Sequence, residues 1–173
     1  MRAWAHLVRL DAIPSGGRSE ALEANAAERA AVAATLGLLS LDRLEAEAEL
    51  KRTSGDELRA RGRVRAEVAQ ACVVTDEPVR AEVDEAFDIL FRPAPIGTPD
   101  EEVELSAGEC DVVFYEGGAV DLGAAATDTL ALALDPYPRA PGAEAALAEA
   151  GVKSEADLEA ERRAASPFAV LKR

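Results

Sequence analysis

The side chains that most often carry out catalysis are scarce in this chain of 173 residues. It contains one histidine, His6, and two cysteines, Cys72 and Cys110. A Ser-His-Asp or Cys-His site needs an imidazole as its base. His6 lies in a run that alternates apolar and polar residues, which is typical of a strand. We therefore expect no catalytic residues and no enzymatic activity.

Motifs that bind phosphates or cofactors are equally hard to find. Residues 16–19 (GGRS) lack the lysine and the spacing of a P-loop, and no Gly-x-Gly-x-x-Gly motif follows a predicted strand. Carboxylates are abundant, but no pair stands out as an acid–base dyad. We expect no cofactor and no small-molecule substrate.

Arginines at every second position form the strongest charge pattern of the chain. They occupy positions 59, 61, 63 and 65, and glutamates alternate in the same way at positions 45, 47 and 49. Period-two alternation on both sides of a glycine-containing turn predicts a β-hairpin. Pairing Leu50 with Leu58 would place Glu49 opposite Arg59 and leave Arg65 without an acidic partner. It would also require an odd number of loop residues.

Two interpretations of these arginines stay open. Cross-strand ion pairs with the glutamates would account for the pattern structurally. The guanidinium groups could instead contact a phosphate backbone, whose oxygens match their geometry. Arg65 is then the best candidate for RNA contact.

The overall charge argues against general affinity for nucleic acid. The net charge is −14 and the pI is about 4.5, so phosphate backbones are repelled at long range. RNA contact would need a local basic patch or a basic protein partner, and simple solubility is the alternative cause of the acidity. With two cysteines, no long apolar segment and no signal-peptide pattern, the sequence predicts a reduced, cytoplasmic protein without a membrane partner.

Element by element, the patterns predict an α+β fold in one domain over residues 1–173. The sheet should be mostly antiparallel, with a barrel-like closure conceivable, and two or three helices should pack on it. We predict strands over residues 4–13, in the hairpin at 44–68, from 79 to 91 after a turn at 75–78, and at 111–115. We expect residues 96–107 to be a mobile acidic loop.

Two helices have clear start and stop signals. Ser19 could cap a helix that runs to Leu36 and ends at Gly37. Asp121 could cap a second helix, which ends near Leu134 because the prolines that follow forbid further helix.

Two further segments have the composition of binding surfaces. Residues 135–139 (DPYPR) hold a tyrosine between two prolines, and Tyr and Arg are favoured at interface hot spots. The alternative is a helix terminator whose tyrosine packs back on the sheet. Residues 166–173 (SPFAVLKR) combine apolar anchors with two cations and could dock on their own domain or on a partner. The candidate binding residues are Asp135, Pro136, Tyr137, Pro138, Arg139 and Phe168.

Three segments, taken in order and spacing, resemble one protein family. They are residues 62–91 with the run QACVVT at 70–75, residues 120–139 from VDLG to DPYPR, and residues 166–173. The ordered set is similar to the YceD family, the large ribosomal RNA subunit accumulation proteins of bacteria and plastids. The resemblance implies a role in the accumulation of 23S ribosomal RNA and in large-subunit assembly, and it supplies no catalytic residue.

Many members of that family carry Cys-x-x-Cys after the central strand, with further Cys or His near the later proline-rich turn, a pattern that looks like a zinc site. Here the matching run has Cys72 as its one thiol, and residues 135–140 contain neither Cys nor His. A zinc site needs three or four such ligands. We therefore expect no metal and interpret Cys72 as a packed structural residue.

Taken together with the acidic composition, the resemblance leads us to expect a non-enzymatic factor that binds a ribosomal protein or a large-subunit precursor particle and that could reach ribosomal RNA indirectly. Two alternatives remain. The protein could bind RNA directly through the arginines, or it could be an adaptor for an RNA-processing enzyme.

Overall fold

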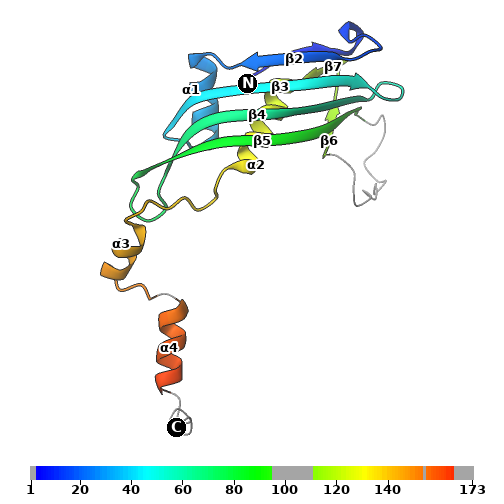
Figure 1. Ribbon diagram of the computed structural model, residues 1–173. Coiled ribbons are helices and arrows are strands. Elements are labelled where there is room, and N and C mark those ends of the chain that lie inside the picture. Colours follow the sequence, from blue (N-terminus) through cyan, green and yellow to red (C-terminus); the bar gives the residue numbers. More distant parts are fainter. Residues whose placement is uncertain (1–2, 95–110, 154, 166–173) are drawn as a thin grey trace. The chain divides into compact units, whose positions relative to one another are not determined.

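The computed structural model describes residues 3–94, 111–153 and 155–165 (Figure 1). Within them the chain forms two compact units. Unit 1 holds the described residues up to Gln70 and those from Arg80 to Pro136, and unit 2 holds Ala71–Val79 and the described residues from Tyr137 onward. The single domain predicted over residues 1–173 stays a prediction. The predicted loop at 96–107 and the segment at 166–173 lie outside the described residues.

Unit 1 is built around a five-stranded sheet. Its described elements are β1 (Leu7–Arg9), a 3₁₀ turn (Leu10–Ala12), β2 (Arg18–Glu23), α1 (Ala26–Leu36), β3 (Ser40–Arg52), β4 (Leu58–Ala71), β5 (Pro78–Pro93), β6 (Asp111–Tyr115), β7 (Ala119–Asp121) and α2 (Leu122–Ala133). The connected ends of β4 and β5 belong to unit 2.

The large sheet has the strand order β2-β3-β4-β5-β6, and β1 pairs with β7 in a second, two-stranded sheet. The β1–β7, β2–β3 and β3–β4 pairs are antiparallel, whereas β5 and β6 are parallel. The predicted α+β class and the mostly antiparallel sheet are confirmed. The sheet does not close into a barrel, because β2 and β6 stay at opposite ends of the strand order.

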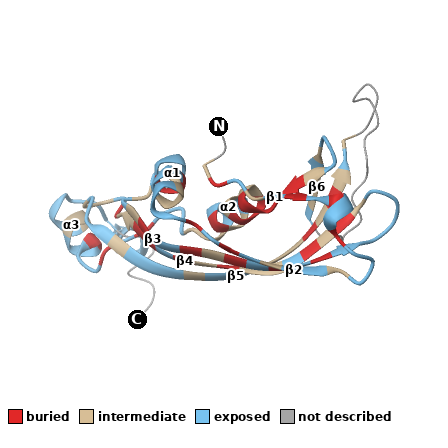
Figure 2. Cartoon of the chain, turned by 90° about the horizontal axis from the view of Figure 1, so that it is seen from above, coloured by how far each residue is buried: buried red, intermediate tan, exposed pale blue. Residues whose placement is uncertain are grey.

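One face of the large sheet is covered and forms the core. Helices α1 and α2 both lie on this face (Figure 2). The alternate residues of β3 and β4 that point into it are apolar and buried, and Val120 and Leu130 are also fully buried. Much of the contribution of the strands to the core is alanine, so the larger side chains supply most of the buried apolar area. The largest fully buried ones in the strands of the sheet are Leu44, Leu50, Leu58, Val64 and Phe91.

The central hairpin has the predicted faces but not the predicted register. Leu50 lies opposite Ala60 rather than Leu58, and Arg52 pairs with Leu58. The turn consists of residues 53–57, closed by a 3.1 Å hydrogen bond from the Thr53 N–H to the Glu57 carbonyl. This loop has an odd number of residues, as predicted, so the alternation of faces is kept while every cross-strand pair moves by two residues.

The N-terminal part differs from its prediction. Residues 18–23 are strand β2 rather than helix, because they pair along β3 from Arg18↔Leu50 to Glu23↔Glu45. Helix α1 therefore begins later, with Asn25 as its cap. The Asn25 side chain accepts from the backbone of Glu28 at 3.0 Å, and the Glu28 carboxylate accepts from the Asn25 N–H at 2.8 Å. This reciprocal pair is a capping box. The helix ends at Gly37, as predicted.

Helix α2 begins at the predicted cap. Asp121 Oδ1 accepts from the Ala124 N–H at 3.1 Å, and the same atom accepts from the His6 backbone N–H at 2.9 Å. One buried carboxylate thus caps the helix and ties the N-terminal segment to it. A strand was predicted over residues 4–13, but within that range only Leu7–Arg9 form a strand, which pairs with β7.

Unit 2 holds two helices among its described residues, α3 (Ala143–Glu149) and α4 (Glu155–Ala165). The described chain therefore has four α-helices. Two of them, α1 and α2, lie on the sheet, which agrees with the two or three packed helices that were predicted. A small cluster of Cys72, Ala140 and Ala143 is buried in this unit, with Val74 and Val79 packed against it.

Candidate functional site

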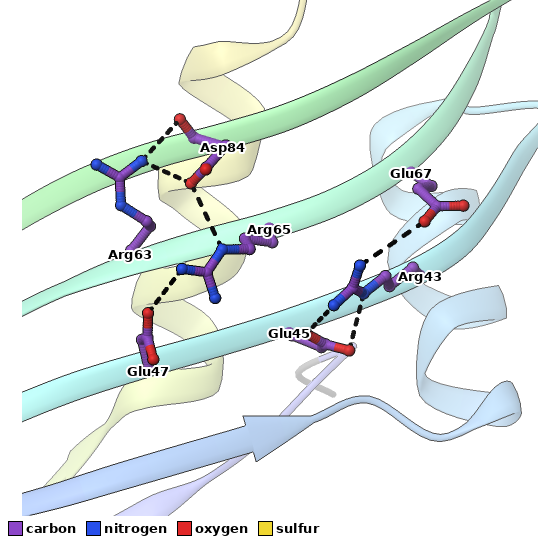
Figure 3. Close-up of polar contacts among 7 residues, drawn as sticks. All are labelled: Arg43, Glu45, Glu47, Arg63, Arg65, Glu67 and Asp84. Carbon is purple, nitrogen blue, oxygen red and sulfur yellow. Dashed lines mark hydrogen bonds and ion pairs between the residues drawn. The ribbon is translucent and has the colours of Figure 1, made fainter.

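The face of the large sheet opposite α1 and α2 carries charged side chains and is here named the charged face. Its residues are those that alternate with the buried ones, so the period of two that builds the core also gathers the charges. Acidic residues of β3, arginines of β4 and acidic residues of β5 follow one another across it. Figure 3 shows part of this arrangement. Residues of these strands that form ion pairs on this face include Glu45, Glu47, Arg59, Arg61, Arg63, Arg65, Asp84 and Asp88.

The four β4 arginines each contact a carboxylate. Asp88 accepts from Arg59 Nε at 2.7 Å and from Arg61 Nε at 2.9 Å. Asp84 accepts from Arg63 Nη1 at 2.6 Å. Strand β5 therefore supplies the carboxylates that bind Arg59, Arg61 and Arg63.

Arg65 has two acidic partners in the structure. Its Nη2 donates to Glu47 Oε1 at 2.9 Å, and its Nε lies 3.8 Å from Asp84 Oδ1 (Figure 3). The prediction that Arg65 has no acidic partner was therefore wrong. It followed from the shifted register, in which the facing residue Glu45 was assigned to Arg63.

A second group of charges lies further along β3. Arg43 donates to Glu45 through Nε at 2.8 Å and Nη2 at 2.6 Å, and its Nη1 lies 3.9 Å from Glu67 (Figure 3). This hydrogen bonding lowers the pKa of the Glu45 carboxyl below its ordinary value.

Hydrogen bonds from arginines also shift the β5 carboxylates. Arg63 lowers the pKa of Asp84, and Arg59 followed by Arg61 lowers the pKa of Asp88. The side chains are about one-third to three-fifths exposed, so solvent screens each pair and its contribution to stability is small. The main effect of the ion pairs is on what the surface can bind, because each of the four β4 arginines already has a carboxylate partner.

The second candidate region lies in unit 2 around Cys72. The Sγ atom is buried and accepts from the Ala140 N–H at 3.2 Å and from the Val74 N–H at 3.5 Å. The Ala140 N–H is the largest cause, followed by the Thr75 side chain, of a Cys72 pKa lowered to about 7. Among the described residues, no group of three His, Cys, Asp or Glu side chains is placed to hold a metal ion.

The proline–tyrosine loop is held by its backbone. The Val73 N–H donates to the Pro138 carbonyl at 2.9 Å within unit 2, and the Gln70 side-chain amide donates to the Asp135 carbonyl at 2.9 Å within unit 1. Pro138 is buried, whereas 72% of the Tyr137 side chain is exposed. The loop therefore presents its tyrosine to solvent.

Some of the other predicted binding residues are exposed, and one of them lies outside the part of the chain that the structure describes. Pro136 and Arg139 are exposed, as is Asp135. Phe168 lies outside the described residues. A binding role for any of these residues stays a prediction.

A comparison with protein-family models decides the identity of the chain. The model described as "Large ribosomal RNA subunit accumulation protein YceD" matches residues 60–173. The chain belongs to the YceD family. Comparisons with curated proteins and with solved structures found no match.

The YceD match covers every site residue predicted individually from the sequence, from Arg65 to Phe168. The family description concerns the accumulation of large-subunit ribosomal RNA, and this is the role of the chain at the level of the family. In the described part of the chain, no helix is both long enough and apolar enough to span a membrane.

Sequence reasoning missed two residues of the charged face, Asp84 and Asp88. The signal was present, because both alternate with Val83, Phe87 and Ile89 along the strand predicted from 79 to 91. The alternation of residues 44–68 pairs the arginines with glutamates of one neighbouring strand, and alternation alone does not determine which strand lies on their other side.

Proposed function

We propose that this YceD protein acts without catalysis, by binding a ribosomal protein or a large-subunit precursor particle during large-subunit assembly in the cytoplasm. The observation that supports protein binding over direct RNA binding is the engagement of the β4 arginines. Each of the four contacts a carboxylate of β3 or β5.

The electrostatics of the whole chain point the same way. An RNA phosphate that approached the charged face would have to displace a carboxylate from an arginine, and that carboxylate would then repel the phosphate. At long range the net charge of −14 repels RNA as well. A basic ribosomal protein is attracted at long range instead, so we propose that ribosomal RNA is reached indirectly through it.

The proline–tyrosine loop is the surface that we propose for the contact with this partner. Tyr137 is exposed on a backbone held by Pro138, and a rigid aromatic residue loses little entropy on binding. Arg139 and Phe168 are proposed to add to the same interaction, since Arg and aromatic residues are common at interface hot spots.

Deletion of the gene tests the role in assembly. The expected result is a selective fall in 23S relative to 16S RNA and in large subunits on a sucrose gradient. Restoring the wild-type gene should restore both. A gradient that is unchanged by the deletion would refute the assembly role.

Binding assays then separate protein from RNA. Purified basic large-subunit proteins should bind the chain, and Tyr137→Ala should weaken the binding by about tenfold, which corresponds to about 1.4 kcal/mol. Leu39→Ala is a matched control, because Leu39 is also exposed. Tight binding of naked 23S fragments that falls steeply with salt would instead favour direct RNA contact. A pull-down that enriches a nuclease and no ribosomal protein would favour the adaptor.

A further inference from the structure

One stretch of the large sheet has a free edge. β5 pairs with β4 on one side along the hairpin. On its other side β6 pairs only with Ile89–Pro93, in the parallel register Ile89↔Asp111 to Pro93↔Tyr115. Among the described residues, no strand pairs with the 80–88 stretch on that side. This edge offers unpaired backbone N–H and C=O groups, which is a ready template for an added strand.

A groove follows the same stretch. It is lined by β5 residues 85–88, by Asp111, and by the end of α2, with a volume of about 460 Å³. This volume falls in the range of ligand-binding clefts. Two of the lining residues are apolar and large. Phe87 of β5 is half-buried, whereas Leu132 of α2 is 85% exposed. Helix α2 therefore borders the edge without sealing it.

The charges beside the edge select the occupant. The 80–88 stretch carries one cation, Arg80, and four carboxylates. Two of these, Asp84 and Asp88, bind arginines of β4, whereas Glu85 lines the groove together with Asp111. A second copy of the chain would bring the same acidic strand, and like charges across a strand pair are destabilising. A lysine- or arginine-rich strand would meet opposite charges instead.

We propose that the free edge of β5 takes up an extended, basic segment of a partner protein as an additional strand of the sheet. This inference rests on the proposed function. It adds a second contact surface for the ribosomal-protein partner, in addition to the proline–tyrosine loop, and names the binding mode and the chemistry of the partner segment. Backbone hydrogen bonds to residues 80–88 hold the segment. Its apolar side chains contact Phe87 and Leu132 in the groove, and its cations face the carboxylates, as in other strand-addition complexes.

A peptide that alternates lysine and valine probes this binding mode on the full chain. The expected result is binding that weakens by about tenfold or more when alternate peptide N–H groups are methylated, because several backbone hydrogen bonds are lost at unchanged charge. A peptide that alternates glutamate and valine should not bind. Equal affinity of the methylated and unmethylated peptides would overturn strand addition and leave charge attraction alone.

Hydrogen exchange locates the site. Backbone amides within residues 80–88 should exchange more slowly in the peptide complex, and those of β2 at the opposite edge should not change. Protection at β2 in place of β5, or no protection at either edge, would overturn the assignment. In that case the β5 carboxylates serve only to prevent edge-to-edge association of the protein itself.

Two substitutions on the groove test its side chains against matched controls. Glu85→Lys and Leu132→Asp should each weaken peptide binding by about tenfold. Glu116→Lys and Leu39→Asp make the same changes at exposed positions away from the groove and should leave it unchanged. Unfolding curves check that each variant is folded. Unaltered binding by both groove variants would contradict the proposal.

The same variants separate this inference from the proposed function. In a deletion strain, the Glu85→Lys, Leu132→Asp double variant should fail to restore 23S RNA while the double control restores it. If the double variant restores it fully, the edge is not the binding site and the assembly role still stands. If the deletion itself changes nothing, the assembly role is the part that fails.

Discussion

Gly62, in the middle of β4, occupies a position where the packing leaves no room for a side chain. An added Cβ at Gly62 would come within 2.6 Å of the Phe87 ring and 2.9 Å of the Ala48 Cα, and closer still to the Glu47 carbonyl oxygen. Backbone atoms of the neighbouring strand cannot move away cheaply. The absence of a side chain at Gly62 is therefore what allows the Phe87 ring to pack against β4 at this position.

We predict that Gly62→Ala lowers the free energy of unfolding by about 1–3 kcal/mol, the usual cost of overpacking a core. Urea denaturation measures it. Gly16→Ala is the matched control, because nothing lies within 4 Å of its added Cβ and its φ is not in the left-handed region. Equal stability of the two variants would contradict the contact at Gly62.

The thiol of Cys72 should make stability depend on pH. Its pKa is lowered from an ordinary value of 9.0 to about 7, first by the Ala140 N–H. A depressed pKa means that folding favours the thiolate, so this stabilisation is fully present above about pH 9 and is lost as the pH falls through 7. The free energy of unfolding of the wild type, relative to Cys72→Ala, should rise between pH 7 and 9. A difference that is constant over this range would contradict the thiolate.

The hairpins show which features of an element can be predicted from sequence. Alternation fixes the two faces of β3 and β4, because a shift by one residue would expose the whole apolar set. A shift by two residues keeps every face and every charge sign, so the pattern could not choose between Leu50↔Leu58 and Leu50↔Ala60. The choice was made by the turn of residues 53–57, and it decided which glutamate meets Arg65.

The predicted start of helix α1 was wrong because a local pattern again left the choice open. Residues 19–23 have a composition compatible with helix, but their pairing with β3 outweighs this weak local preference. The capping box of Asn25 and Glu28 was visible in the sequence as N-x-x-E. Ser19 is also a residue that caps helices and follows the break at Gly16 and Gly17, so the local signals did not decide between Ser19 and Asn25.

The ion pairs of the charged face should contribute to stability only above acid pH. Hydrogen bonds from arginines lower the pKa of Asp84 and of Asp88 in the folded state. The stability that they supply is present above the ordinary aspartate pKa of about 4 and is lost as the pH falls below it.

We therefore predict that the Asp84→Asn, Asp88→Asn double variant is less stable than the wild type at neutral pH, and that the gap narrows below about pH 4. Urea denaturation across this range measures the gap. A loss that stays the same at every pH would show that the substitutions act through packing rather than through charge.

At the scale of the whole molecule, the α+β class, the two faces of the central hairpin and the α2 cap were predictable, whereas the parallel β5–β6 pair and the division into two units were not. The former depend on patterns within one or two elements. The latter depend on contacts between segments far apart in the chain, such as Leu7 and Asp121, which periodicity does not encode. The alternating acidic and basic residues of the charged face can be seen in the sequence. Which acidic residue pairs with which arginine can be known only from the register of the strands.

The two units should differ in how readily their backbones open. The side chains of α4 described here are all exposed, including 46% of Leu158, and a helix of 11 residues without apolar packing is marginal in water. Native-state hydrogen exchange should therefore be fast along α4 and slowest in β3 and β4 of unit 1. Protection of α4 equal to that of β4 in the isolated protein would show that a further surface covers the helix.

The pairing of β1 with β7 also sets an order on how the protein is made. The strands from β2 to β5 meet neighbours that are close in the chain, so they can assemble while synthesis continues. Trp4 and the backbone of His6, by contrast, find their partners only at Gly123 and Asp121. On the ribosome, residues 4–9 emerge before the start of α2 and must wait until it has left the exit tunnel before their contacts are complete. This segment is thus synthesised before the strands of the large sheet but is locked in place only after β2 to β5.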